Sequence, residues 1–160
     1  SFLFHTFATR WAAVADVAPI LCFILAYVYL AGRDLLGLRR GWAVLSVAAF
    51  FPYAALTVPL FGMIPGLGSS AGYAPIPVLI AAYALAVRDR DTARGLWIGA
   101  ALLVISLVFR TVDGPVCAAW PVGTHFLWHL MNAAMLAWMI EVWRRHVIRA
   151  GLPLEHGSPR

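Results

Sequence analysis

Five side chains that could do chemistry lie within or beside apolar stretches of the sequence. They are Ser1, His5, Asp16, His125 and His129. Ionisable groups are costly in a lipid environment, and within membrane spans they indicate a functional site by default. His125 and His129 are four residues apart, which puts both imidazoles on one face of a helix at a spacing that can hold one metal ion. Ser1 and His5 repeat this spacing.

Three neutral imidazoles and one open position are the ligand arrangement of a catalytic zinc ion. His5, His125 and His129 can provide the three imidazoles, and water would take the fourth position. Zinc lowers the pKa of bound water from about 15.7 to about 7, so a nucleophile becomes available at neutral pH. Asp16 can take the proton and later deliver it to a leaving group. The Ser1 hydroxyl can donate a hydrogen bond to a developing oxyanion.

Taken alone, each of these residues also has a structural interpretation. A histidine at a membrane interface often serves only as a polar group. Ser1 can bond to its own helix backbone, and Asp16 can be the N-cap of its helix. The zinc interpretation is favoured because the five residues occur together, and it requires that the spans bring all five to one depth.

The elements that would position these residues are membrane spans. The 160-residue chain is 62% hydrophobic and only 12% charged, whereas globular chains are on average about 45–50% apolar and about 25% charged. This composition excludes an ordinary soluble domain and favours an integral membrane protein. The chain opens at Ser1 within an apolar, aromatic stretch that lacks the features of a signal peptide. We therefore expect an N-terminal part to precede it.

Apolar runs and polar breaks alternate along the chain, which predicts one all-α membrane domain over residues 1–150 and a polar cytoplasmic tail over 151–160. Residues 1–7 would be the end of a span. Five full spans are expected at residues 14–31, 42–61, 73–87, 96–109 and 124–143, since a spanning helix needs about 20 mostly apolar residues. The glycines and prolines of residues 113–123 predict a loop.

The arginines indicate how these spans are oriented. All 12 basic residues are arginine, and most of them follow the first, third and fifth full spans. Only Arg10 and Arg110 fall on the other side. The positive-inside rule then places the arginine-rich side and the C-terminus in the cytoplasm. His5, Asp16 and the histidine pair consequently share one depth near the outer face. Topology thus explains the net charge of +5 better than nucleic-acid binding does.

These motifs together resemble a known family. Ser1-x-x-x-His5, Asp16 within Ala15-Asp-Val-Ala-Pro19, and His125-Phe-Leu-Trp-His129 are similar to the alkaline ceramidases, which belong to the CREST group of seven-span membrane hydrolases. Phe109-Arg-Thr-Val-Asp113 resembles the bacterial members. The resemblance covers essentially the whole chain. It implies a seven-transmembrane-helix CREST-type bundle, of which this chain covers the end of the second span through the seventh.

The resemblance also implies a function, a zinc-dependent cleavage of the N-acyl bond of ceramide-like membrane lipids to a sphingoid base and a fatty acid. His5, His125 and His129 would bind zinc, Asp16 would be the acid–base residue, and Ser1 would assist at the carbonyl. Tyr73 would contact the substrate, although an interfacial tyrosine is an equally good interpretation. A bacterial inner-membrane location is implied, and we expect no nucleic acid or protein partner.

Two other functions stay open. A zinc-stabilised membrane receptor or scaffold would keep the three histidines but would need neither a base at Asp16 nor an open coordination position. A transporter is less favoured because few ionisable residues follow one another along a pathway through the spans. The role of Asp16 therefore separates the enzyme from the receptor.

Overall fold

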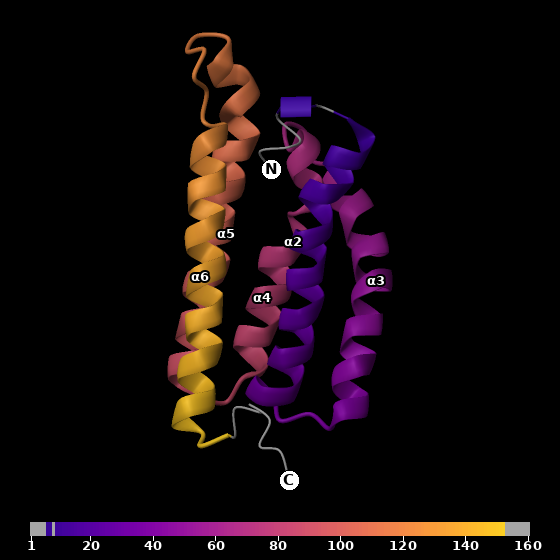
Figure 1. Ribbon diagram of the computed structural model, residues 1–160, viewed down its shortest axis with the longest axis vertical. Coiled ribbons are helices and arrows are strands. Elements are labelled where there is room, and N and C mark those ends of the chain that lie inside the picture. Colours follow the sequence, from indigo (N-terminus) through magenta and orange to yellow (C-terminus); the bar gives the residue numbers. More distant parts are fainter. Residues whose placement is uncertain (1–5, 8, 153–160) are drawn as a thin grey trace.

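The structure is a computed structural model that describes residues 6–7 and 9–152. Over these residues the chain is all-helical and contains no strands (Figure 1). The predicted site residues Ser1 and His5, and the tail from residue 153, lie outside the described residues. Asp16, His125 and His129 lie on α-helices, and Tyr73 lies in the turn that follows the 3-10 helix Gly68–Gly72.

Five α-helices form most of the described part of the chain. They are α2 (Arg10–Leu30), α3 (Arg40–Gly62), α4 (Pro75–Ala86), α5 (Arg90–Cys117) and α6 (His125–Arg149). A π-helical turn, Ala31–Leu35, extends α2, and a 3-10 helix, Gly68–Gly72, precedes α4. Helices α5 and α6 lie side by side along one side of the bundle, whereas α2 and α3 form the other side (Figure 1).

Four of these helical segments are long and apolar enough to cross a membrane: Arg10–Leu35, Arg40–Gly62, Gly68–Ala86 and Arg90–Cys117. In the two segments that hold α2 and α3, only 6% of the most apolar window is buried inside the protein. Helices that are apolar on all sides and still expose their side chains are suited to lipid rather than water. The fold thus supports the expected membrane-embedded helical protein.

The fifth expected full span corresponds to α6, which differs from the others in composition. This helix has 25 residues, but its histidines, its asparagine and the charged residues near its end keep it outside the set of sufficiently apolar helices. It lies along α5 over much of its length (Figure 1). Within the described residues, four segments rather than five therefore meet the condition for a span.

The contact between α5 and α6 depends on small residues. A Cβ atom at Gly95 would lie 2.7 Å from Cγ2 of Val142, and one at Gly99 would collide with the sulfur of Met139. Glycines four residues apart on one helix face let two helix backbones approach closely. Trp138 adds a hydrogen bond of 2.8 Å from its indole Nε1 to the Gly95 carbonyl oxygen.

The prediction of a loop over residues 113–123 was wrong for its first five residues. Helix α5 continues through Asp113 and Pro115 and ends at Cys117. A proline inside a helix removes one backbone hydrogen bond, and α5 ends two residues after Pro115. The contacts of Asp113 with α6 favour the helical course.

Candidate functional site

The first two turns of α6 carry both histidines that the sequence predicts as metal ligands. The rings of His125 and His129 are 4.9 Å apart between centroids, with planes inclined by 75°. The imidazole of His125 is 31% exposed. The i, i+4 spacing therefore brings two imidazole rings next to each other on one helix face, as metal binding requires.

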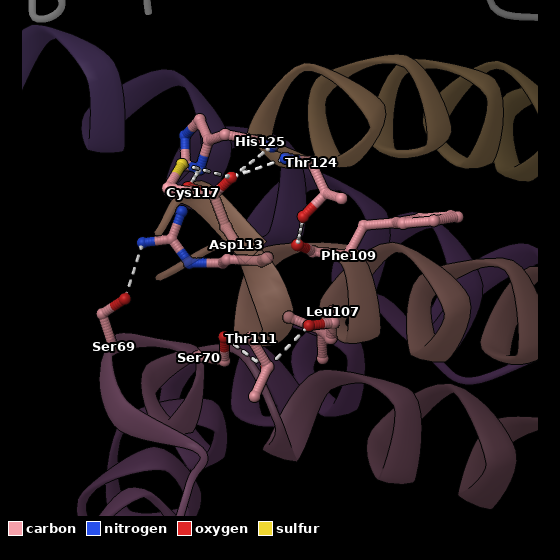
Figure 2. Close-up of polar contacts among 10 residues, drawn as sticks. Ser69, Ser70, Leu107, Phe109, Thr111, Asp113, Cys117, Thr124 and His125 are labelled. Carbon is pink, nitrogen blue, oxygen red and sulfur yellow. Dashed lines mark hydrogen bonds and ion pairs between the residues drawn. The ribbon is translucent and has the colours of Figure 1, made fainter. Parts of the chain in front are cut away.

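A carboxylate from α5 holds the start of α6. Asp113 Oδ1 accepts the backbone N–H of Thr124 at 2.7 Å and that of His125 at 2.8 Å (Figure 2). The first N–H groups of a helix have no partner within the helix, and a negative charge is favourable at that end. Asp113 thus caps α6 from a neighbouring helix.

The same carboxylate also lies beside the ring of His125. Asp113 Oδ2 is 3.7 Å from His125 Nδ1. A carboxylate next to one ring nitrogen of a metal-binding histidine typically orients the ring and leaves the other nitrogen for the metal. With Nδ1 facing Asp113, His125 would bind a metal through Nε2.

Gly123 makes this cap possible. Its φ is +64°, and a Cβ atom there would lie 2.5 Å from both Asp113 Oδ1 and Cys117 Sγ. Only glycine adopts this backbone conformation at little cost and leaves space for the carboxylate. The next residue, Thr124, donates from its hydroxyl to the Phe109 carbonyl oxygen at 2.7 Å (Figure 2).

Sequence reasoning missed this role of Asp113. The structure turns its carboxylate toward Thr124 and His125. Its occurrence as an acidic residue close to an apolar run was the signal that could have found it. The bonding partners lie 11 and 12 residues further along the chain, beyond the range of helix periodicity.

Asp16, the predicted acid–base residue, lies within α2. It is the seventh residue of that helix, whose N-cap is Thr9, so the alternative that Asp16 caps the helix is wrong. Ile20, four residues further along, lines an apolar pocket shared with α6. Asp16 continues that face of α2 by one turn, toward the end of the bundle at which α6 begins (Figure 1).

The apolar pocket lies between α2, α4, α5 and α6. Tyr73 and Trp128 line it near the histidines, and their rings are 5.4 Å apart. Trp128 is almost fully buried, and its ring also lies 6.3 Å from that of His129. The pocket extends from Asn132 toward Met139, along the face of α6 that points into the bundle.

Tyr73 is held in this position by the 3-10 helix that precedes it. The hydroxyl groups of Thr111 of α5 and Ser70 in that element are joined by a 2.9 Å hydrogen bond (Figure 2). The hydroxyl of Thr111 also bonds the Leu107 carbonyl oxygen at 2.8 Å. Tyr73 thereby becomes part of the pocket wall beside Trp128.

The donor set can be compared with the needs of zinc. Two neutral imidazoles at one place fit zinc, which binds histidine nitrogen readily. Between residues 6 and 152, leaving out residue 8, no three His, Cys, Asp or Glu side chains form a group that could hold a metal. The third predicted ligand, His5, is outside that part of the chain.

Comparisons of the chain with family models, curated proteins and solved structures gave no match.

Proposed function

We propose that the chain acts as a zinc-dependent intramembrane amide hydrolase of the alkaline ceramidase type, with a seven-helix CREST-type bundle. The observation that carries this proposal is the pair of imidazoles 4.9 Å apart beside an apolar pocket between apolar helices. A water-activating metal and a lipid-binding cavity are the two parts that such an enzyme needs. The resemblance of the histidine and aspartate motifs to the ceramidases supplies the substrate class, a ceramide-like lipid.

In this proposal His5, His125 and His129 hold the ion, and Asp113 orients His125. When bound, zinc supplies a Lewis acid that polarises a carbonyl group and activates water near neutral pH. Asp16 removes a proton from the attacking water and gives it to the leaving nitrogen. Ser1 donates a hydrogen bond to the carbonyl oxygen as negative charge develops there.

The overall reaction balances as a hydrolysis. The oxygen of water forms a bond to the acyl carbon, the carbon–nitrogen bond breaks, and the nitrogen leaves with a proton as a free amine. The products are a fatty acid and a sphingoid base. The apolar wall formed by Ile20, Phe23 and Leu136 would keep the acyl chain in an environment like the bilayer from which it comes.

A membrane receptor or scaffold is the alternative, and one observation favours it. Asp113 and His125 already join α5 to α6, so a metal at the histidine pair would strengthen a structural junction. Such a protein would bind zinc without turnover. The two functions therefore predict the same metal content and different hydrolysis rates.

Metal analysis and a lipid amide hydrolysis assay on the same purified protein test the proposal. We expect His125→Ala and His129→Ala each to lose most bound zinc, because two ligands rarely retain the ion. His5→Ala should lose zinc and activity together. His146→Ala is the matched control, since His146 contacts Thr92 at 2.8 Å at the opposite end of α6. Near-stoichiometric zinc in the double variant of His125 and His129 would rule out the site.

A further inference from the structure

Arg110 lies beside two aromatic rings at the histidine end of the pocket. Its Cζ atom is 5.2 Å from the ring centroid of Tyr73 and 5.0 Å from that of Trp128. Cation–π contacts of this kind occupy the flat faces of a guanidinium group. They hold the group in place and leave the N–H donors along its edge to other partners.

Those edge donors are little used within the described part of the chain. Nε of Arg110 is buried and has no hydrogen-bond partner there, and Nη2 reaches only Ser69 Oγ at 3.4 Å. A buried charged donor without a partner costs more than a neutral one, because it loses water without replacement. The arrangement is therefore incomplete without an acceptor.

Several other arginines, unlike Arg110, have carboxylate partners in the structure. At the opposite end of the bundle, Arg144 and Arg145 bond to Glu141. Arg149 bonds to Asp89 and Asp91. Near Arg110, the carboxylate of Asp113 is instead bonded to the start of α6. The positive charge of Arg110 is thus left for a ligand.

The rings beneath Arg110 identify the kind of ligand. Tyr73 and Trp128 both line the apolar pocket, so a molecule with its hydrocarbon chain in the pocket would bring its polar end to Arg110. A planar guanidinium matches the two oxygens of a carboxylate or phosphate group. An amphiphile with an anionic group satisfies both the pocket and the arginine.

We propose that Arg110 binds the carboxylate or phosphate group of a lipid whose hydrocarbon chain occupies the apolar pocket. The inference rests on the proposed function in that the anion would belong to the substrate or to the product. Ceramide is neutral, so the anion is either an acidic head group of the lipid amide or the carboxylate of the released fatty acid. Arg110 would then be a specificity-determining residue.

Binding measurements test the anion site without requiring turnover. Purified protein in nanodiscs of neutral phosphatidylcholine is titrated with palmitate, hexadecyl phosphate or hexadecanol in competition with a fluorescent fatty acid. We expect the two anions to bind more tightly than the alcohol. Arg110→Gln should weaken palmitate binding by roughly 10–100-fold, the range of a hydrogen bond to a charged group, and leave hexadecanol unchanged. Arg110→Lys should fall between, since it keeps the charge but not the planar fork.

Arg10→Gln is the matched control, because it removes a positive charge at the same end of the bundle, from the exposed start of α2. It should bind palmitate as the wild type does. Equal palmitate affinity in wild type and Arg110→Gln, or hexadecanol binding as tight as palmitate in the wild type, overturns the proposal. The second comparison needs no variant and decides the matter even if Arg110→Gln does not fold.

A hydrolysis arm distinguishes the two sources of the anion. If the anion is a head group, the wild type should cleave N-palmitoylglycine faster than the ceramide with the same acyl chain, and Arg110→Gln should lose that preference. If it is the product, ceramide is cleaved and palmitate inhibits less in Arg110→Gln. If the protein hydrolyses neither substrate but still binds palmitate in a manner that depends on Arg110, the proposed function is rejected and the anion site is retained.

Discussion

At the scale of single residues, Asp113 connects the last turns of α5 with the histidine pair at the start of α6. Its two oxygens cap α6 and face His125, and Gly123 leaves the room that this requires. The position of the histidine pair therefore depends on α5 as well as on α6. A carboxylate that orients a ligand in this way typically affects metal affinity by about 10–100-fold.

The residue that separates enzyme from receptor is Asp16. Asp16→Asn keeps the size and shape of the side chain but cannot accept a proton from water. We expect zinc content close to that of the wild type and a loss of hydrolysis of about 10²–10⁴-fold, the usual contribution of acid–base catalysis. Zinc is measured on the purified variant, and its hydrolysis rate is measured in the same preparation.

The control is Asp91→Asn, which removes an acid at the opposite end of the bundle, where Asp91 pairs with Arg149 at 2.9 Å. This variant should keep both zinc and rate. If Asp16→Asn also keeps full hydrolysis, Asp16 is not the base. If the wild-type protein binds zinc but cleaves no lipid amide, the hydrolase function is rejected and the receptor function is favoured.

At the scale of elements, apolar runs in the sequence predicted where helices occur but not where they end. The span predicted over residues 14–31 is helical from Arg10 to Leu35, partly because Trp143 of α6 donates a 2.7 Å hydrogen bond to Asp34. Asp113 extends α5 in a comparable way. These are contacts between residues more than ten positions apart, and hydropathy along the chain contains no information about them.

The sequence likewise predicted part of the candidate site. The i, i+4 rule is local, so it correctly placed His125 next to His129. It did not predict the partners that hold them, Asp113 and Gly123, because these depend on how α5 packs against α6. The aromatic contacts of Arg110 depend on Tyr73 and Trp128, which come from separate parts of the chain.

The surroundings of two helical glycines, Gly95 in the α5–α6 contact and Gly41 in α3, predict opposite effects for their replacement by alanine. Gly95→Ala would place a methyl group 2.7 Å from Val142 Cγ2, and the branched valine has little freedom to move away. We expect a loss of about 1–3 kcal/mol, typical of overpacking, measured as a lower unfolding temperature in detergent. Gly41→Ala, with no atom within 4 Å of the added Cβ, should be neutral or stabilising by up to about 1 kcal/mol. A Gly95→Ala protein as stable as wild type would contradict the close packing.

The start of α5 predicts a pH dependence. Hydrogen bonds from the hydroxyl and backbone N–H of Thr92 hold the pKa of Asp89 below its ordinary value. Because the folded pKa is lowered, the stabilisation is present above the ordinary pKa and is lost as the pH falls through the lowered one. Asparagine caps helices about as well as aspartate. Asp89→Asn should therefore keep the cap and flatten the decline in unfolding temperature below about pH 4. If the unfolding temperature of the variant declines as steeply as that of the wild type, other carboxylates cause the pH dependence.

At the scale of the whole molecule, the two ends of the bundle differ in charge and in chemistry. One end holds the arginines that follow α4 and those near the end of α6. Of these, Arg144 and Arg145 form ion pairs with Glu141, and Arg149 forms ion pairs with Asp89 and Asp91. The other end, where α5 ends and α6 begins (Figure 1), holds the histidine pair, Asp113 and Arg110. The positive-inside rule would place the first end in the cytoplasm, and the candidate site near the outer face.

This orientation can be tested with single cysteines. The background carries Cys22→Ser and Cys117→Ser, since both native cysteines are exposed. In intact cells, a membrane-impermeant thiol reagent should not label Arg90→Cys, at the start of α5, and should label it once the membrane is opened. Ala119→Cys, in the connection from α5 to α6, should be labelled in intact cells. These two positions lie at opposite ends of α5, so one membrane crossing separates them.

The pattern of labelling has a direct consequence for the site. If Arg90→Cys is labelled from outside and Ala119→Cys only after the membrane is opened, the orientation is inverted and the histidine pair faces the cytoplasm. Labelling of both from the same side would show that α5 does not cross the membrane. Only the expected pattern, in which Arg90→Cys is protected and Ala119→Cys is labelled in intact cells, places His125, Asp113 and Arg110 where lipid from the outer leaflet could reach them.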